Sequence, residues 1–245
     1  MSMHALILRG SLAALALLAA PAVHAGVCDA RFMHDGGRLV LAGSGIVKVS
    51  ADLTFSSVSK RGKEDCSALV SGTATYALAG LPGGKSTLDH GMAVKGGRAT
   101  FERRGDAGAS PRGGFDPRLL GVFGYGVPIT KEGQTLPAET IRLEVGDRGP
   151  EGKVGVTPTV VRLGEKTVGR KQRIETAAAG SQECWPVSYA RDTDATQASI
   201  QGLVLPIPAM RSTVTDWFCP ALNMVLRQDI VQSGQKAVIE VTEVR

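Results

Sequence analysis

The apolar residues near the C-terminus recur with a period of two, and this pattern most constrains the fold. In residues 222–231 one side of a strand would hold the apolar side chains Leu222, Met224, Leu226 and Ile230, while Asn223, Arg227 and Asp229 would face the other side. Successive side chains of a strand point to opposite faces, so the pattern predicts a strand with one buried face. Similar short segments, separated by Gly-rich turns, recur in residues 38–101 and 139–245. The sequence therefore predicts a mainly β protein, with an antiparallel curved sheet, a sandwich or a partial barrel and little helix after residue 25.

The first 25 residues have the zones of a secretory signal peptide. Arg9 and the amino terminus supply positive charge, and residues 12–20 are small or apolar. Val23 and Ala25 occupy the two positions that a signal peptidase recognises before its cleavage site. The apolar run is too short for a permanent anchor, and no later run reaches the length of a membrane span. We therefore expect cleavage after Ala25, export to the periplasm and no integral membrane segment. The residues before Cys28 fit lipid attachment poorly.

Four cysteines follow residue 25, and an even number in an exported chain predicts disulfides: Cys28, Cys66, Cys184 and Cys219. Sequence alone allows three pairings. A Gly- and Pro-rich stretch divides the cysteines two and two, so we expect Cys28 to pair with Cys66 and Cys184 with Cys219. No two cysteines have the spacing of a zinc site, and we expect no metal and no cofactor.

The same stretch suggests four segments in the chain. They are a signal peptide (1–25), an N-terminal β unit (26–104), a linker or lid (105–138) and a C-terminal antiparallel β unit (139–245). An apolar insert inside the linker predicts that it either packs back on a sheet or gates a ligand pocket. The candidate lid residues are Leu119, Leu120, Val122, Phe123 and Tyr125.

Basic residues are densest between 162 and 173. These residues are Arg162, Lys166, Arg170, Lys171 and Arg173. They suggest either a face that contacts anionic lipid headgroups or an acidic partner, or a solvated strand face. The net charge of +5 and the aromatic content of 4% do not suit a nucleic-acid binder. Residues 79–86 resemble a phosphate-binding loop but lack the helix that must follow, so we expect no nucleotide site.

No motif of a catalytic site is present in the sequence. His34 and His90 each neighbour a carboxylate, but adjacent residues of a strand point to opposite faces. We therefore assign no catalytic residue, and expect binding rather than catalysis.

The stretch Asp216-Trp217-Phe218-Cys219-Pro220-Ala221-Leu222-Asn223-Met224-Val225-Leu226-Arg227 resembles a strand pair of uncharacterised bacterial periplasmic proteins. In those proteins a tryptophan strand turns at a proline into a strand with a basic residue. Their curved antiparallel sheets are similar to the outer-membrane lipoprotein carrier fold. The resemblance covers residues 135–245 at most, and it implies a fold and a compartment but no catalytic residues.

These observations favour a non-enzymatic periplasmic protein that binds an apolar ligand or an envelope partner, in lipid handling or envelope assembly. A structural or interaction module of a secretion or surface apparatus is one alternative, and a periplasmic hydrolase is another. A ligand binder should have a concave pocket near residues 119–127, whereas an interaction module should have an apolar patch or an open sheet edge. A hydrolase should have His34 or His90 in a cleft, beside a carboxylate or a serine.

Overall fold

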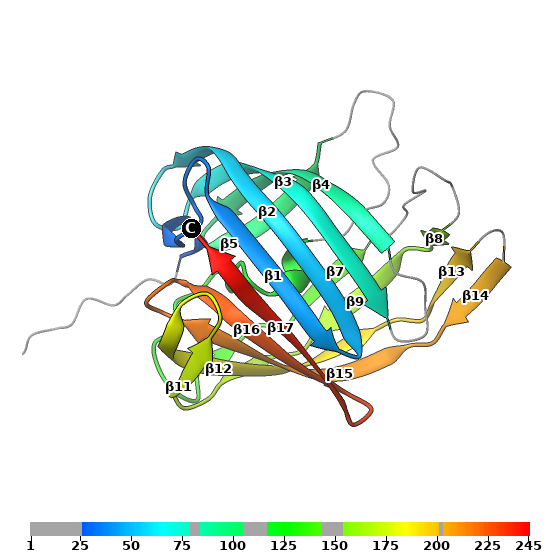
Figure 1. The fold of residues 1–245 in the computed structure, drawn as a ribbon. Coiled ribbons are helices and arrows are strands. Elements are labelled where there is room, and N and C mark those ends of the chain that lie inside the picture. The colour runs from blue at the N-terminus through cyan, green and yellow to red at the C-terminus, as the bar shows by residue number, and fades with distance from the viewer. Residues whose placement is uncertain (1–25, 79–83, 105–116, 144–153, 201–202) are drawn as a thin grey trace, which may run out of the picture.

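The structure is a computed structural model that describes residues 26–78, 84–104, 117–143, 154–200 and 203–245 (Figure 1). The predicted signal peptide, most of the glycine-rich loop at 79–86 and residues 105–116 of the predicted linker lie outside these ranges. Among the described residues, no helix has the length and apolar character that crossing a bilayer requires.

In the part of the chain that the structure describes, fourteen strands form one large antiparallel sheet, which confirms the predicted fold class. The N-terminal half supplies five consecutive strands: β1 (Arg38–Gly45), β2 (Val47–Lys60), β3 (Cys66–Leu78), β4 (Gly84–Lys95) and β5 (Arg98–Arg103). The C-terminal half supplies nine: β6 (Thr135–Leu136), β7 (Glu139–Leu143), β9 (Thr159–Leu163), β10 (Lys166–Val168), β11 (Gln172–Thr176), β12 (Gly180–Thr193), β15 (Met210–Cys219), β16 (Met224–Gln232) and β17 (Gln235–Val244). The main path runs β5-β4-β3-β2-β1-β17-β16-β15-β12-β10-β6.

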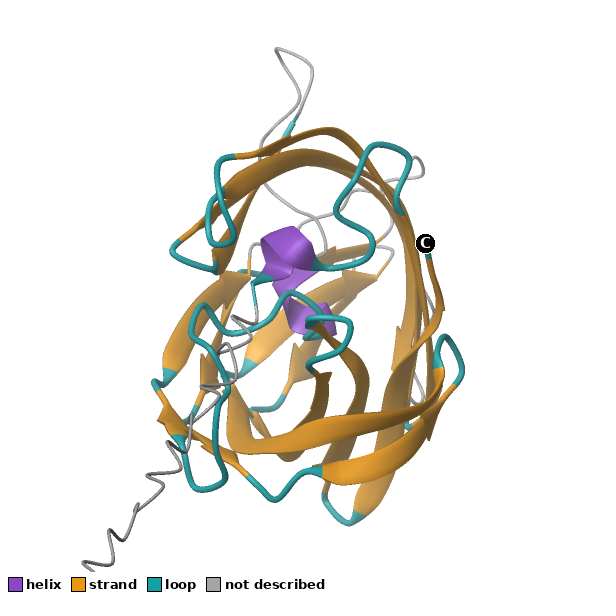
Figure 2. Cartoon of the chain, turned by 90° about the vertical axis from the view of Figure 1, so that its left-hand side faces the viewer, coloured by secondary structure: helices purple, strands orange, loops and turns teal. Residues whose placement is uncertain are grey.

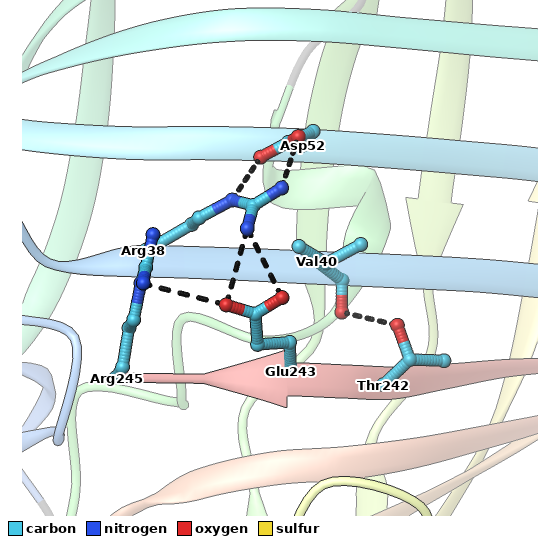
Figure 3. Close-up of polar contacts among 6 residues, drawn as sticks. All are labelled: Arg38, Val40, Asp52, Thr242, Glu243 and Arg245. Atoms are coloured by element: carbon cyan, nitrogen blue, oxygen red, sulfur yellow. Dashed lines mark hydrogen bonds and ion pairs between the residues drawn. The ribbon is translucent and has the colours of Figure 1, made fainter.

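The two halves of the chain meet where β1 pairs with β17, with Leu39 opposite Val244. On the surface of this seam, Arg38 lies between the carboxylates of Asp52 on β2 and Glu243 on β17 (Figure 3). Both candidate β units thus contribute to one continuous sheet, and their division into separate units stays a prediction.

A smaller sheet has the order β14-β13-β8 and consists of β8 (Val154–Val156), β13 (Thr196–Ile200) and β14 (Leu203–Ile207). It extends to one side of the main sheet in Figure 1. Leu203 and Val204 lie on β14, a strand at the edge of this sheet. They are 63% and 55% exposed, and as neighbours on a strand they point to opposite faces.

The main core lies on the concave side of the sheet. The short 3-10 helices η1 (Val27–Asp29) and η2 (Pro117–Leu120) lie inside the curve (Figure 2). Aromatic rings from several segments meet there: the ring of Phe32 lies 4.6 Å from that of Phe55, and the ring of Phe123 lies 4.8 Å from that of Phe101. Burial of these rings supplies a large part of the hydrophobic stabilisation.

Two disulfides are present, with the predicted pairing. Cys28–Cys66 ties the segment before β1 to β3, and Cys184–Cys219 joins the neighbouring strands β12 and β15. The motif around Trp217 is also a strand pair, because β15 turns through residues 220–223 into β16. Asn223 adopts a φ of +54° in that turn, a conformation that asparagine tolerates better than most residues.

Candidate functional site

The described part of the predicted linker, residues 117–138, packs against the sheet. Leu120 is 1% exposed, and Val122 and Phe123 are buried with it in the main core. Ile129 and Leu136 belong to a smaller apolar cluster with Phe218. Residues 117–126 therefore fill the concave side of the sheet, next to β5 on one side and β15 on the other.

Two glycines let this segment come close to the sheet. Gly126, with a φ of +71°, packs its backbone on Arg98 and on Gly97 of the β4–β5 turn. Gly121, with a φ of +72°, lies so close to β15 and β16 that a Cβ atom would be 2.6 Å from Nε2 of Gln228. Both positions combine a left-handed backbone with a lack of space, which explains why glycine occupies them.

A cleft of about 60 Å³ remains between this segment and the sheet. Its apolar wall consists of Ala99, Phe123, Ile141 and Leu163. Its other walls include seven polar or ionisable side chains: Arg98, Arg118, Tyr125, Glu139, Lys166, Tyr189 and Asp216. So many ionisable groups around a small space identify this cleft as the candidate functional site.

Asp216 is the centre of a buried polar cluster. It is 1% exposed, and it lies opposite Gln228 in the register of β15 with β16. Its Oδ2 accepts hydrogen bonds from the hydroxyls of Tyr125 (2.8 Å) and Tyr189 (3.1 Å), while its Oδ1 accepts one from Nε2 of Gln228 (2.8 Å). Burial raises the pKa of Asp216 above its usual range, although these three donors act in the opposite direction.

The tyrosine hydroxyls respond to the same surroundings. Burial raises the pKa of both Tyr125 and Tyr189 well above the usual value, and the Asp216 charge adds to the effect. Both hydroxyls therefore stay protonated and act as fixed donors to the carboxylate.

Lys166 is a buried basic group of the cleft. It is 5% exposed, and its Nζ lies 5.9 Å from the ring centre of Tyr125 and 5.5 Å from that of Tyr189. Among the described residues, the one hydrogen bond of the Lys166 ammonium is donated to the carbonyl of Pro137 (3.3 Å). Burial lowers the pKa of the Lys166 ammonium, and the nearby carboxylates of Glu139 and Asp216 oppose that effect.

The predicted lid residues fall into two groups. Leu120, Val122 and Phe123 are buried, and Phe123 and Tyr125 line the cleft. The side chain of Leu119 lies outside the described part of the structure. The lid function itself stays a prediction, because the structure shows where this segment packs and does not show it moving.

The predicted basic residues do not share one environment. Lys166 faces the cleft, whereas Arg162 forms an ion pair with Asp194, and Arg173 forms one with Glu183 (3.5 Å). The ammonium of Lys171 lies 4.8 Å from the ring centre of Trp185, and Arg170 is exposed. A shared contact face for these residues stays a prediction.

Neither histidine lines the cleft. His34 is exposed, with its ring beside the carbonyl of Asp35, and His90 is buried on β4 with its ring edge-on to Phe101. Within the described ranges, no group of three potential metal ligands comes together.

The sequence did not single out the polar cleft residues Arg98, Arg118 and Glu139, nor the buried polar residues Tyr189, Asp216 and Gln228. A signal was present for Asp216 and Gln228. Asp216 shares the strand face of Val214 and Phe218, and Gln228 shares that of Leu226 and Ile230, so each polar residue occupies an apolar position of the alternation. A polar residue at a buried strand position needs a partner, and here the two residues are partners of each other.

No model of a known protein family matches the chain, and no curated protein matches it. Two solved structures are similar in fold. One is described as a candidate lipoprotein from Parabacteroides distasonis, with 11% identity and a TM-score of 0.47 over 89% of this chain and 99% of that chain. The other is described as a candidate exported protein with a YmcC-like fold from Bacteroides fragilis, with 8% identity and a TM-score of 0.41 over 86% of this chain and 96% of that chain. Similarity this distant transfers no site residue and no activity.

Proposed function

We propose that this protein is a non-enzymatic protein of the periplasm, and that its cleft binds part of an apolar ligand or of an envelope partner. The two disulfides support a location outside the cytoplasm, since such bonds persist in oxidising compartments. The descriptions of the two similar structures, as a lipoprotein and an exported protein, agree with that location.

The observation that supports binding is the way the polar groups of the cleft are held. Asp216 is fixed by three donors, and the rings of Tyr125 and Tyr189 flank the ammonium of Lys166. Such an arrangement keeps its geometry before a ligand arrives, which reduces the entropic cost of binding. A preformed, partly apolar cleft with few polar groups is the usual form of a small ligand site.

The size of the cleft limits what can enter it. A space of about 60 Å³ admits a small group and not a whole acyl chain. We therefore propose that the ligand inserts one end, and that the rest of it lies outside the cleft.

A cleft-filling variant tests this function. Ala99 lies on β5 and lines the cleft, so Ala99→Phe should occupy the space. Its neighbour Thr100 is exposed on the opposite face, and Thr100→Phe is the matched control. The full chain, purified from its own cell envelope, should show a bound mass by native mass spectrometry that Ala99→Phe loses and Thr100→Phe keeps. A bound mass that persists in Ala99→Phe, or none in the wild type, would contradict the proposal.

The sequence suggests replacing Leu120 and Phe123 with aspartate to test the lid, but the structure makes that variant unsuitable. Both side chains are buried in the main core, so two carboxylates there would unfold the protein.

The edge strand β14, with its exposed apolar side chains, favours a second candidate function, an interaction module. Leu203 and Val204 would then contact a partner protein, which Leu203→Ser with Val204→Ser should weaken. Val231→Ser, at another exposed apolar site, is the control. In-cell crosslinking from β14 to a partner should disappear in the double variant, and its persistence would rule out this surface.

A further inference from the structure

We propose that the group bound in the cleft is an anion, a carboxylate or a phosphate, and that Lys166 is its direct partner. This inference rests on the proposed function of the cleft and adds the chemistry of the ligand. It follows from four features of the cleft: the state of Lys166, the state of Asp216, the charge of the rim and the apolar wall.

The first feature is that Lys166 is a buried cation whose nearest carboxylates, Glu139 and Asp216, act on it from a distance and form no direct ion pair with it in the described residues. Within the described ranges no carboxylate forms an ion pair with it, and its contacts are two aromatic rings and the carbonyl of Pro137. An ammonium has three donors, so two of them remain for a ligand. Buried charges are normally paired, and an unpaired one beside a cleft indicates that the partner comes from outside the chain.

The second feature is that Asp216 acts on the Lys166 ammonium through its charge but makes no direct hydrogen bond or ion pair with it. Both of its oxygens are already engaged by Tyr125, Tyr189 and Gln228, and burial shifts the pKa of Asp216 toward the neutral form. The carboxylate therefore orients the two tyrosine rings that flank Lys166, and it leaves the ammonium available.

The third feature is the charge of the rim. Arg98 and Arg118 also line the cleft, and Glu139 is the remaining carboxylate there. Arg118 and Glu139 are 4.0 Å apart, so they largely balance each other. The cleft therefore has three basic side chains, Arg98, Arg118 and Lys166, against the two carboxyl groups of Glu139 and Asp216, and this excess of positive groups favours an anion.

The fourth feature is the apolar wall, which favours an anion attached to an apolar body. The apolar part of the ligand would pack against this wall as it leaves the cleft. The wall consists of Ala99, Phe123, Ile141 and Leu163. A carboxylate and a phosphate share the required charge and acceptor oxygens, and the experiment must distinguish them.

Calorimetric titration of the full chain tests the inference with three probes: sodium hexanoate, neutral hexanol and inorganic phosphate. We expect hexanoate to bind at least about tenfold more tightly than hexanol. Lys166→Met keeps the length of the side chain and removes the charge, so it should weaken anion binding by at least about tenfold. Lys171→Met is the matched control, because Lys171 also lies over an aromatic ring but outside the cleft.

A thermal melt separates a ligand-binding lysine from a structural one. Lys166→Met should keep or raise the melting temperature without ligand, because it removes the cost of burying a charge. Hexanoate should then raise the melting temperature of the wild type and not that of Lys166→Met. A lysine that only supports the fold would instead give a lower melting temperature and unchanged binding.

These measurements distinguish a phosphate from a carboxylate, and they test the anion inference separately from the proposed binding function. Tight phosphate binding with weak hexanoate binding would assign a phosphate, and the reverse would assign a carboxylate. Equal binding of hexanol and hexanoate, or anion binding that Lys166→Met retains, would overturn the anion inference. So would a wild type that binds neither anion. The native mass measurement on Ala99→Phe remains a separate test of whether the cleft binds anything.

Discussion

Asp216 shows how one polar residue on an apolar strand face organises its surroundings. It lies between β12 and β16 in the sheet, so donors from both neighbours reach it: Tyr189 from β12 and Gln228 from β16. Tyr125, from the segment 117–126, adds a third donor and thereby connects that segment to the sheet. The carboxylate is thus both a part of the core and the support of the cleft.

The raised pKa of Asp216 predicts a specific dependence of stability on pH. The native state holds this proton more tightly than the unfolded chain, whose aspartates titrate near a pKa of about 3.9. Between that value and the raised native pKa, the contribution of Asp216 to stability falls as the pH rises. Asp216→Asn removes this contribution, so the wild type should lose stability relative to the variant across that window. Urea unfolding at a series of pH values measures it, and parallel profiles would contradict the prediction. Glu165→Gln, at an exposed site, controls for the loss of one negative charge.

Gly121 allows a second prediction at the residue scale. Gly121→Ala should destabilise the fold, because a left-handed alanine costs about 1–2 kcal/mol and its Cβ would lie 2.6 Å from Gln228 Nε2. Gly133 has a similar φ of +75° with no atom within 4 Å of a built Cβ, so Gly133→Ala measures the backbone cost alone. Chemical denaturation should show a larger loss for Gly121→Ala. Equal losses would mean that the close contact costs nothing.

At the scale of elements, the alternation of residues predicted some strands well and the segment 117–126 poorly. The pair β15 and β16 was predictable because Leu222, Met224, Leu226 and Ile230 mark one face of a long strand. Lys166 was assigned to a basic face because β10 has three residues, too few to display a period. The packed position of residues 117–126 depends on the close contact of Gly126 with Gly97. These residues are distant in the sequence, so no local sequence pattern predicts their contact.

The seam between β1 and β17 predicts an effect of salt and pH on stability. Arg38 donates to both oxygens of Asp52 (2.8 and 2.7 Å) and to Glu243 (3.1 Å) (Figure 3). Its hydrogen bonds to Asp52 and its charge lower the pKa of Asp52. A lowered aspartate pKa stabilises the fold above the unfolded value of about 3.9, and this stabilisation is lost as the pH falls through the native pKa. Arg38→Met should therefore lower the urea midpoint near neutral pH.

The effect of Arg38→Met should shrink in strongly acidic solution and in high salt, because exposed ion pairs are screened. Arg173→Met is the control, since Arg173 forms a more exposed pair with Glu183 away from this seam. A deficit of Arg38→Met that is the same in low and high salt would point to lost packing instead of lost charge.

At the scale of the whole molecule, each disulfide closes a loop within one half of the chain. The sequence separations are 38 for Cys28–Cys66 and 35 for Cys184–Cys219. On the chain-entropy model, loops of this length contribute about 4 kcal/mol each. Replacing Cys184 and Cys219 together with alanine should lower the free energy of unfolding by about 2–4 kcal/mol. Urea denaturation measures this, with the Cys28–Cys66 double variant for comparison, and an unchanged midpoint would contradict it.

The pairing of β1 with β17 also affects the order in which the sheet folds. Arg38 and Glu243 are 205 positions apart, so their strands meet only after nearly the whole chain is available. Pairings between such distant segments form slowly, because loop closure precedes the gain from contact. A nascent chain emerges with its N-terminus first, and β1 lacks one of its neighbours until the ten residues of β17 arrive. The sheet is therefore completed last at its middle, and this delay favours the unfolded form in which a chain crosses a membrane.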